Sequence, residues 1–165
     1  MRIALCLNGK VGNVVGKSGQ TNTGNNDVLY LSYLHWHKYL LSQYDVDVFV
    51  WCWDTELKDE VNNLFSPVSS VYEKQIKFVS PKRLKLWRAK TKGVQGRVQG
   101  HYSRYYSLKK CVELKSKYER ENNFEYDIVM TSRFDLCLTK KINMDMWNQK
   151  IKKFKGKQQG LLVLN

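Results

Sequence analysis

Residues 46–54 read VDVFVWCWD, a nearly continuous run of β-branched and aromatic side chains that stops at Asp54. Such a run predicts a strand covered on both faces, which is the kind of strand that lies inside a parallel sheet. Two further apolar runs, at residues 2–8 and residues 127–131, predict buried strands earlier and later in the chain. These three strands form the framework around which the remaining segments are arranged.

The segments between these strands have helical character. Apolar residues recur at three- and four-residue steps, and the expected helices cover residues 26–42, 55–65, 102–120 and 144–150. Asn26 or Asp27 is expected to cap the first of these helices. Two more strands are expected, at residues 75–79, where Ile76 and Phe78 alternate with polar residues, and at residues 160–164. Strands that alternate with helices predict an α/β, Rossmann-like fold with a mainly parallel sheet flanked by helices.

Polar residues stand directly after the predicted strands. They are Asn8, Gly9, Asp54, Arg133 and Asp135. Because the carboxyl ends of parallel strands meet at one edge of a sheet, these residues are expected to converge on one site. For Asp54 a second role stays open, since its carboxylate could cap the helix that follows. The neighbouring Trp53 either packs in the core or stacks on a base or sugar.

Arg133 and Asp135 lie two residues apart and share a side of an extended chain. One interpretation is a buried ion pair between the two side chains. In the other, Asp135 coordinates Mg²⁺ or Mn²⁺ on a diphosphate, because carboxylate oxygens suit those ions, while Arg133 contacts phosphate or sugar.

The chain has 165 residues and a net charge of +13, and 42% of its residues are hydrophobic. That length and hydrophobic content predict one globular domain, residues 1–165, and argue against a disordered chain. Residues 74–120 hold 15 basic and two acidic residues, so this segment carries the whole excess of positive charge. Such a segment favours polyanions, which include nucleic acids, anionic membrane surfaces and phosphorylated substrates.

The four cysteines, Cys6, Cys52, Cys111 and Cys137, form no CxxC pair, which argues against a zinc site. Cys6, Cys52 and Cys137 lie within apolar runs and are expected to be reduced core residues. No run approaches the roughly 18 apolar residues of a membrane-spanning helix, and the chain starts without a secretory signal. We therefore expect a mature chain that begins at Met1 and is cytoplasmic.

Several segments, in this order, resemble bacterial and large-virus sugar transferases of the GT-A type. The first strand ends in Asn8-Gly9, the second reads VDVFVWCWD, and residues 103–136 read SRYYSLKKCVELKSKYERENNFEYDIVMTSRFDL. The family carries a small-Gly turn, a "DvFihtWD" strand, a "YS...k...L...YE" helix and a "YD.virtRfDl" strand, so the resemblance covers residues 1 to about 138. It implies a nucleotide-sugar-binding fold, a location in a bacterial or virus-infected host cell, and transfer of a sugar to a hydroxyl of a glycan or glycoprotein.

The resemblance also implies roles for individual residues in binding a nucleoside-diphosphate-sugar. Asn8 and Gly9 form the nucleotide-side loop, and Trp53 and Asp54 lie near the base or ribose. The residues expected at a helix start facing the donor are Ser103, Tyr106 and Ser107, and further cations are expected from Arg97 and Arg104. Asp135 stands for the last Asp of the metal-binding DxD motif, whereas Arg133 replaces the first, so that an arginine could neutralise diphosphate charge.

The expected mechanism has the acceptor attack the anomeric carbon while Arg133 and an Asp135-held metal stabilise the leaving diphosphate. An inverting enzyme also needs a carboxylate base. Asp145 is the acidic residue that follows Asp135, and its other interpretation is an ordinary helix residue. The part of the chain that binds the acceptor is expected to be reduced or missing.

Two alternatives stay open. One is a nucleic-acid-binding module, because residues 74–120 interleave Trp87, Tyr102, Tyr105 and Tyr106 with cations, although they lack an RRM, KH or helix-turn-helix signature. The other is a protein that has the nucleotide-sugar-binding fold but no catalytic activity.

Overall fold

The computed structural model describes residues 1–12, 25–78, 94–154 and 161–163, with only the backbone at 94–98, 154 and 161–163. Its strands are β1 (Ile3–Gly9), β2 (Val46–Cys52), β3 (Ser69–Tyr72), β4 (Ile128–Ser132) and β5 (Leu161–Val163). They form one sheet in the order β3-β2-β1-β4-β5, and every neighbouring pair is parallel. The expectation of an α/β fold with a parallel sheet is therefore confirmed.

The strand order reverses direction at β1. The chain passes from β1 to β2 and β3 on one side of the sheet, and later to β4 and β5 on the other. Ile3 is in register with Val46 of β2 and with Ile128 of β4, so β1 is the shared central strand. In open parallel sheets, ligands bind in the crevice outside the carboxyl ends of the strands at such a switch point.

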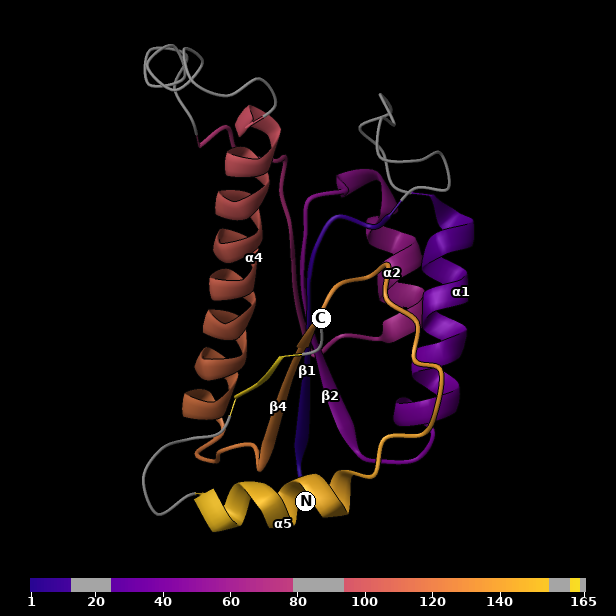
Figure 1. Cartoon of the computed structure of the whole chain (residues 1–165), viewed down its shortest axis with the longest axis vertical. Coiled ribbons are helices and arrows are strands. Elements are labelled where there is room, and N and C mark those ends of the chain that lie inside the picture. Colours follow the sequence, from indigo (N-terminus) through magenta and orange to yellow (C-terminus); the bar gives the residue numbers. More distant parts are fainter. Residues whose placement is uncertain (13–24, 79–93, 155–160, 164–165) are drawn as a thin grey trace.

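Helices cover both faces of the sheet (Figure 1). They are α1 (Asn26–Trp36) with its π-helical continuation η1 (His37–Leu41), the 3-10 turn η2 (Thr55–Leu57), α2 (Lys58–Phe65), α4 (Val94–Glu121) and α5 (Met144–Phe154). In β1, Ala4 and Cys6 pack toward α4, while Ile3, Leu5 and Leu7 pack into a larger core with the other helices. Two apolar layers therefore hold the sheet between the helices and fix the ends of its strands.

The third strand in chain order differs from the prediction. It is β3, at Ser69–Tyr72, and residues 73–78 have no regular structure. The expected strand at residues 75–79 is therefore wrong over its described part. The backbone there is held by one side chain of α4, because Gln99 donates to the Ile76 carbonyl at 2.7 Å and accepts from the Phe78 N–H at 2.9 Å. The alternation of Ile76 and Phe78 therefore does not reflect a strand.

Three local predictions need correction. The cap of α1 is Asn25, whose side-chain oxygen accepts from Asp27 N–H at 2.7 Å, and not Asn26 or Asp27. Helix α4 starts at Val94, well before the expected residue 102. Cys6 and Cys52 are buried as expected, but Cys137 is exposed, because it follows β4 in a segment without regular structure. Within the described residues, no helix is long and apolar enough to cross a lipid bilayer.

Candidate functional site

A cavity of about 220 Å³ lies at the carboxyl end of the sheet beside α4. Its lining residues are Asn8, Gly9, Lys10, Trp53, Gln75, Gly100, Ser103, Arg104, Ser107 and Arg133. Asn8 and Gly9 end β1, while Trp53, Gln75 and Arg133 come after β2, β3 and β4. Each of the first four strands therefore contributes to one cavity, as expected for a site at the carboxyl ends of parallel strands.

The cavity brings together most of the residues singled out from the sequence. Those that line it are Asn8, Gly9, Trp53, Ser103, Arg104, Ser107 and Arg133. Ser103 and Ser107 lie well inside α4 and not at its start, because the helix begins at Val94. Asp54, Tyr106 and Asp135 are not lining residues, and the side chain of Arg97 is outside the described part. Sequence reasoning missed Lys10, Gln75 and Gly100, although Lys10 directly follows the predicted Asn8-Gly9 turn.

Asn8 joins the two strands that flank the switch point to helix α4. Its Nδ2 donates to the Ser132 carbonyl of β4 at 3.1 Å, and its Oδ1 accepts from the Ser107 hydroxyl at 3.4 Å. The next residue, Gly9, has φ of 103°, a conformation that side chains with a Cβ rarely adopt. Its carbonyl accepts from the Trp53 N–H at 3.0 Å, so the ends of β1 and β2 are tied together.

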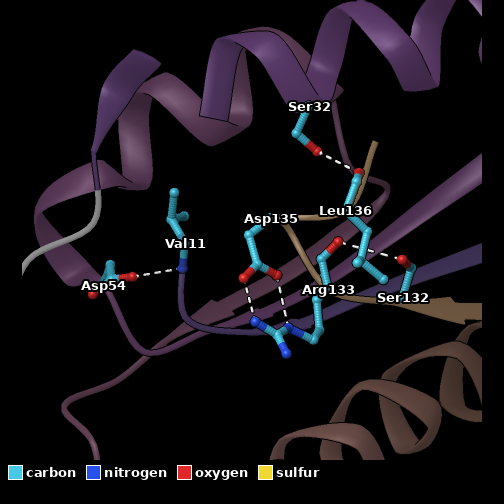
Figure 2. Close-up of polar contacts among 7 residues, drawn as sticks. All are labelled: Val11, Ser32, Asp54, Ser132, Arg133, Asp135 and Leu136. Atoms are coloured by element: carbon cyan, nitrogen blue, oxygen red, sulfur yellow. Dashed lines mark hydrogen bonds and ion pairs between the residues drawn. The ribbon is translucent and has the colours of Figure 1, made fainter. Parts of the chain in front are cut away.

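Asp54 supports the loop that follows β1. Its Oδ2 accepts from the Val11 N–H at 2.7 Å, and only 1% of the residue is exposed (Figure 2). The turn η2 that follows Asp54 receives no hydrogen bond from its side chain, so the helix-cap interpretation is wrong. The carboxylate thus positions the backbone next to the cavity and does not form its wall.

Cys52 is the last residue of β2, lies beside Asp54 and packs in the larger core. The backbone N–H of Asp54 donates to the Sγ of Cys52 at 3.4 Å. Burial is the main cause that raises the pKa of Cys52 from 9.0 to about 12, so the group is a neutral thiol near pH 7. A neutral buried thiol is a packing residue and not a nucleophile.

An aromatic group forms one side of the site. Trp53 stacks on Tyr106 of α4, with ring centroids 5.5 Å apart and an interplanar angle of 23°. Phe78 contacts the same Tyr106 ring at 5.3 Å. Tyr106 does not line the cavity itself, but it packs against the ring of Trp53, which does.

The remaining wall combines cations with neutral polar groups. Lys10, Arg104 and Arg133 line the cavity, and no carboxylate does so among the described residues. The Gln75 amide donates to the Ser103 hydroxyl at 2.8 Å, which orients both groups. Cations, hydroxyls and amides are the groups with which proteins bind phosphate oxygens. This wall therefore suits an anionic ligand.

Arg133 and Asp135 form an ion pair after β4. The Arg133 Nε donates to Asp135 Oδ1 at 2.7 Å, and its Nη2 binds Asp135 Oδ2 (Figure 2). The ion pair is therefore confirmed, but its expected burial is wrong, because the Arg133 side chain is half exposed. Among the described residues, no three His, Cys, Asp or Glu side chains gather where they could hold a metal ion.

Asp145, the one candidate for the base of an inverting enzyme, does not line the cavity and has the place of an ordinary helix residue. It is an exposed residue in the first turn of α5, which crosses near the amino-terminal end of β1, away from the cavity (Figure 1). It therefore does not join the residues around the cavity.

Comparison with known proteins yields no match: no family model fits the sequence, and no curated protein or solved structure is significantly similar to the chain.

Proposed function

We propose that the cavity binds the nucleoside diphosphate part of a nucleotide-sugar and that the protein is a glycosyltransferase of the GT-A type. The sugar would pass to a hydroxyl of a glycan or glycoprotein. The observation that carries the proposal is the convergence of Lys10, Arg104 and Arg133 with neutral hydrogen-bonding groups on a cavity beside the switch point. The order of sequence motifs that resembles GT-A transferases supports the same conclusion.

The three cations have a direct role in this proposal. In the transfer step, the acceptor oxygen bonds to the anomeric carbon as the bond from that carbon to the diphosphate oxygen breaks. The electron pair leaves with the nucleoside diphosphate, so negative charge develops on its oxygens. Lys10, Arg104 and Arg133 would stabilise that charge from fixed positions, which is where electrostatic catalysis is most effective.

The neutral residues would orient the donor. Asn8 is already hydrogen-bonded to the Ser132 carbonyl at the end of β4 and to the Ser107 hydroxyl of α4, so little ordering is needed when a ligand binds. Trp53 lines the cavity but is only 4% exposed and stacks on Tyr106, so it is a core-packing residue that shapes the wall and not a platform for a base or sugar ring. Binding energy from these remote contacts would position the anomeric carbon for attack.

Donor binding is tested by thermal unfolding with a panel of UDP-, GDP- and dTDP-sugars, each with EDTA or with Mn²⁺. At least one donor should raise the unfolding temperature, because a ligand that binds only the folded state stabilises it. Arg104→Ala should weaken that effect. Lys109→Ala is the matched control. It removes a cation from the same helix, and the side chain of Lys109 is 75% exposed. If no donor stabilises the protein, the proposal is refuted.

Turnover is tested separately by release of nucleoside diphosphate from each donor that binds. Release that depends on an added glycan acceptor supports a transferase. Binding without release favours the alternative of a catalytically silent protein with the same fold.

A nucleic-acid-binding function is the second candidate, favoured by the exposed rings of Tyr102 and Tyr105 on α4 next to Arg104. Exposed aromatic rings among cations can stack on single-stranded bases. Steeply salt-dependent binding to an arbitrary oligonucleotide, lost in Tyr102→Ala, would favour this candidate.

A further inference from the structure

We infer that Asp135 is a positioning residue that fixes the guanidinium of Arg133 at the cavity wall, and that the cavity binds a diphosphate without a divalent metal ion. The inference rests on the proposed function, because it names how the diphosphate of that donor is held. It departs from the expectation that Asp135 is a metal ligand.

The geometry of the pair assigns these roles. One guanidinium engages both carboxylate oxygens of Asp135, through Nε at 2.7 Å and through Nη2 (Figure 2). An arginine has five N–H donors, so this two-point contact leaves others for a phosphate. Arg133 lines the cavity and Asp135 does not. The carboxylate therefore faces the arginine, and the arginine faces the ligand.

The residues do not fit a divalent ion at Asp135. Both oxygens that would coordinate the ion are engaged by a guanidinium, and an ion placed there would stand next to that positive charge. Within the described residues, Asp135 is not part of any group of three His, Cys, Asp or Glu side chains that could hold a metal ion.

The backbone around the pair is held from three sides. The Ser32 hydroxyl donates to the Leu136 carbonyl at 3.0 Å, and the Ser132 hydroxyl donates to the Arg133 carbonyl at 3.3 Å (Figure 2). On the third side is Gly12, where an added Cβ would lie 2.6 Å from the Cβ of Asp135. That distance is too short for real side chains, so the glycine lets the loop after β1 pack directly on Asp135. An ordered carboxylate in turn restricts the rotamers of Arg133.

Metal dependence is tested by calorimetric titration of the full chain with UDP, GDP and dTDP, in EDTA and in Mg²⁺ or Mn²⁺. The dissociation constant of a nucleotide that binds should agree within about twofold between EDTA and metal. Binding that appears only with metal would overturn the inference while leaving the transferase proposal intact. Inorganic pyrophosphate in EDTA serves as the second probe, and it should bind to the wild-type protein. If pyrophosphate binds but no nucleotide does, the transferase proposal fails and the inference stands.

The positioning role is tested by a double-mutant cycle on Asp135→Ala and Arg133→Ala, with pyrophosphate or a nucleotide as ligand. Each single substitution should weaken binding about tenfold, because each removes the ordered charge-assisted contact. In the Arg133→Ala background, Asp135→Ala should have no further effect, since Asp135 acts through Arg133. Additive losses would show that Asp135 acts independently and would overturn its assigned role.

Two further variants test whether positive charge alone, or the loss of any carboxylate, explains the change in affinity. Arg133→Lys keeps the charge but not the planar two-point geometry, and it should also lose most of the affinity. Asp127→Ala removes a partly exposed carboxylate at the opposite end of the sheet and should bind as the wild type does. Unfolding by urea checks that each variant folds. If Asp135→Ala fails to fold, the near-isosteric Asp135→Asn replaces it in the cycle.

Discussion

The two ends of the sheet carry hollows of different size and opposite chemistry. The hollow at the amino end has about 380 Å³ and is lined by Arg2, Ile3, Asp45, Asp47, Tyr118, Asn122 and Phe124. The cavity at the carboxyl end has about 220 Å³, and its charged lining residues are all cations. The larger hollow is therefore the more acidic one, and the smaller is the one suited to an anion.

The polar groups of the amino end are used to hold the fold together. The Tyr126 hydroxyl donates to Asp47 at 2.6 Å, and its backbone N–H donates to Glu119 at 3.0 Å. Asp127 accepts from the backbone N–H of Arg2 at 2.8 Å. At the carboxyl end, the cation of Arg133 is half exposed and faces a cavity. The contrast teaches that the direction of polar groups, and not the volume of a hollow, identifies the site in this molecule.

Alkaline solution should produce the largest effect, and it should act at both ends. Burial is the main cause that raises the pKa of Cys52 to about 12, and burial with the nearby Asp47 raises the pKa of Tyr126 above its usual value of 10.0. The folded state keeps both groups neutral while the unfolded chain ionises them. The stability they contribute is complete below their unfolded pKa values and is lost as pH rises toward their folded ones. Each group should lower the free energy of unfolding by up to about 1.4 kcal/mol per pH unit.

Urea unfolding at a series of pH values above 9 checks this prediction. Cys52→Ala should remove the contribution of Cys52, and Tyr126→Phe that of Tyr126. A wild-type stability that stays constant with pH over this range would contradict the assignment.

Two aspartates that each accept one backbone N–H offer a direct comparison between the ends. Asp54→Ala should cost about 2 kcal/mol, because it leaves the buried Val11 N–H without its acceptor, and should also weaken nucleotide binding. Asp127→Ala should cost less than about 1 kcal/mol, since Asp127 is 37% exposed and water can replace it. Chemical denaturation measures both values. Equal losses would mean that the two ends do not differ in this way.

Tyr126→Phe separates stability from function. Loss of the hydroxyl that binds Asp47 should lower the free energy of unfolding by about 1.5 kcal/mol, because the bond has a charged acceptor. Nucleotide affinity should not change, because Tyr126 lies at the opposite end from the cavity. A matching loss of affinity would show that the ends are coupled.

Gly9→Ala should have a small effect on stability, about 1 kcal/mol. A Cβ added at Gly9 would meet no atom within 4 Å, so there is space for it. The backbone, however, has a φ of 103°, which is strained for a residue with a Cβ. The strain should shift the Gly9 carbonyl away from Trp53 and lower nucleotide affinity. Lys10→Ala, one residue further on, leaves the backbone unstrained and isolates the contribution of the charge.

The fold could be predicted where buried strands consist of continuous runs of apolar residues. Strands β1, β2 and β4 are apolar because both of their faces are covered, so each was visible as a continuous run. The edge strand β3 is only half buried, and its sequence SSVY carries no such signal. The misleading alternation at Ile76 and Phe78 arose because Phe78 packs on Tyr106 of α4, which no local pattern shows.

The site could be predicted only as far as the strand ends. Asn8, Gly9, Trp53 and Arg133 follow from the rule that parallel strands place their carboxyl ends together. The contribution of Gln75 depends on how α4 crosses the sheet, because it is bound by Ser103 of that helix. Likewise, the role of Asp54 follows from a hydrogen bond to Val11, a residue 43 positions away, which the sequence around Asp54 does not reveal.

The central position of β1 has a consequence for how the protein is made. The side chain of Asn8 bonds to Ser132 across 124 positions of the chain, and Ile3 pairs with Ile128. On the ribosome, β1 is synthesised before β4 and must wait for β4 before its second edge is covered. Long-range parallel pairing of this kind is slow and leaves apolar edges exposed meanwhile. The cavity, with Arg133 in its wall, can thus form only after β4 has paired with β1.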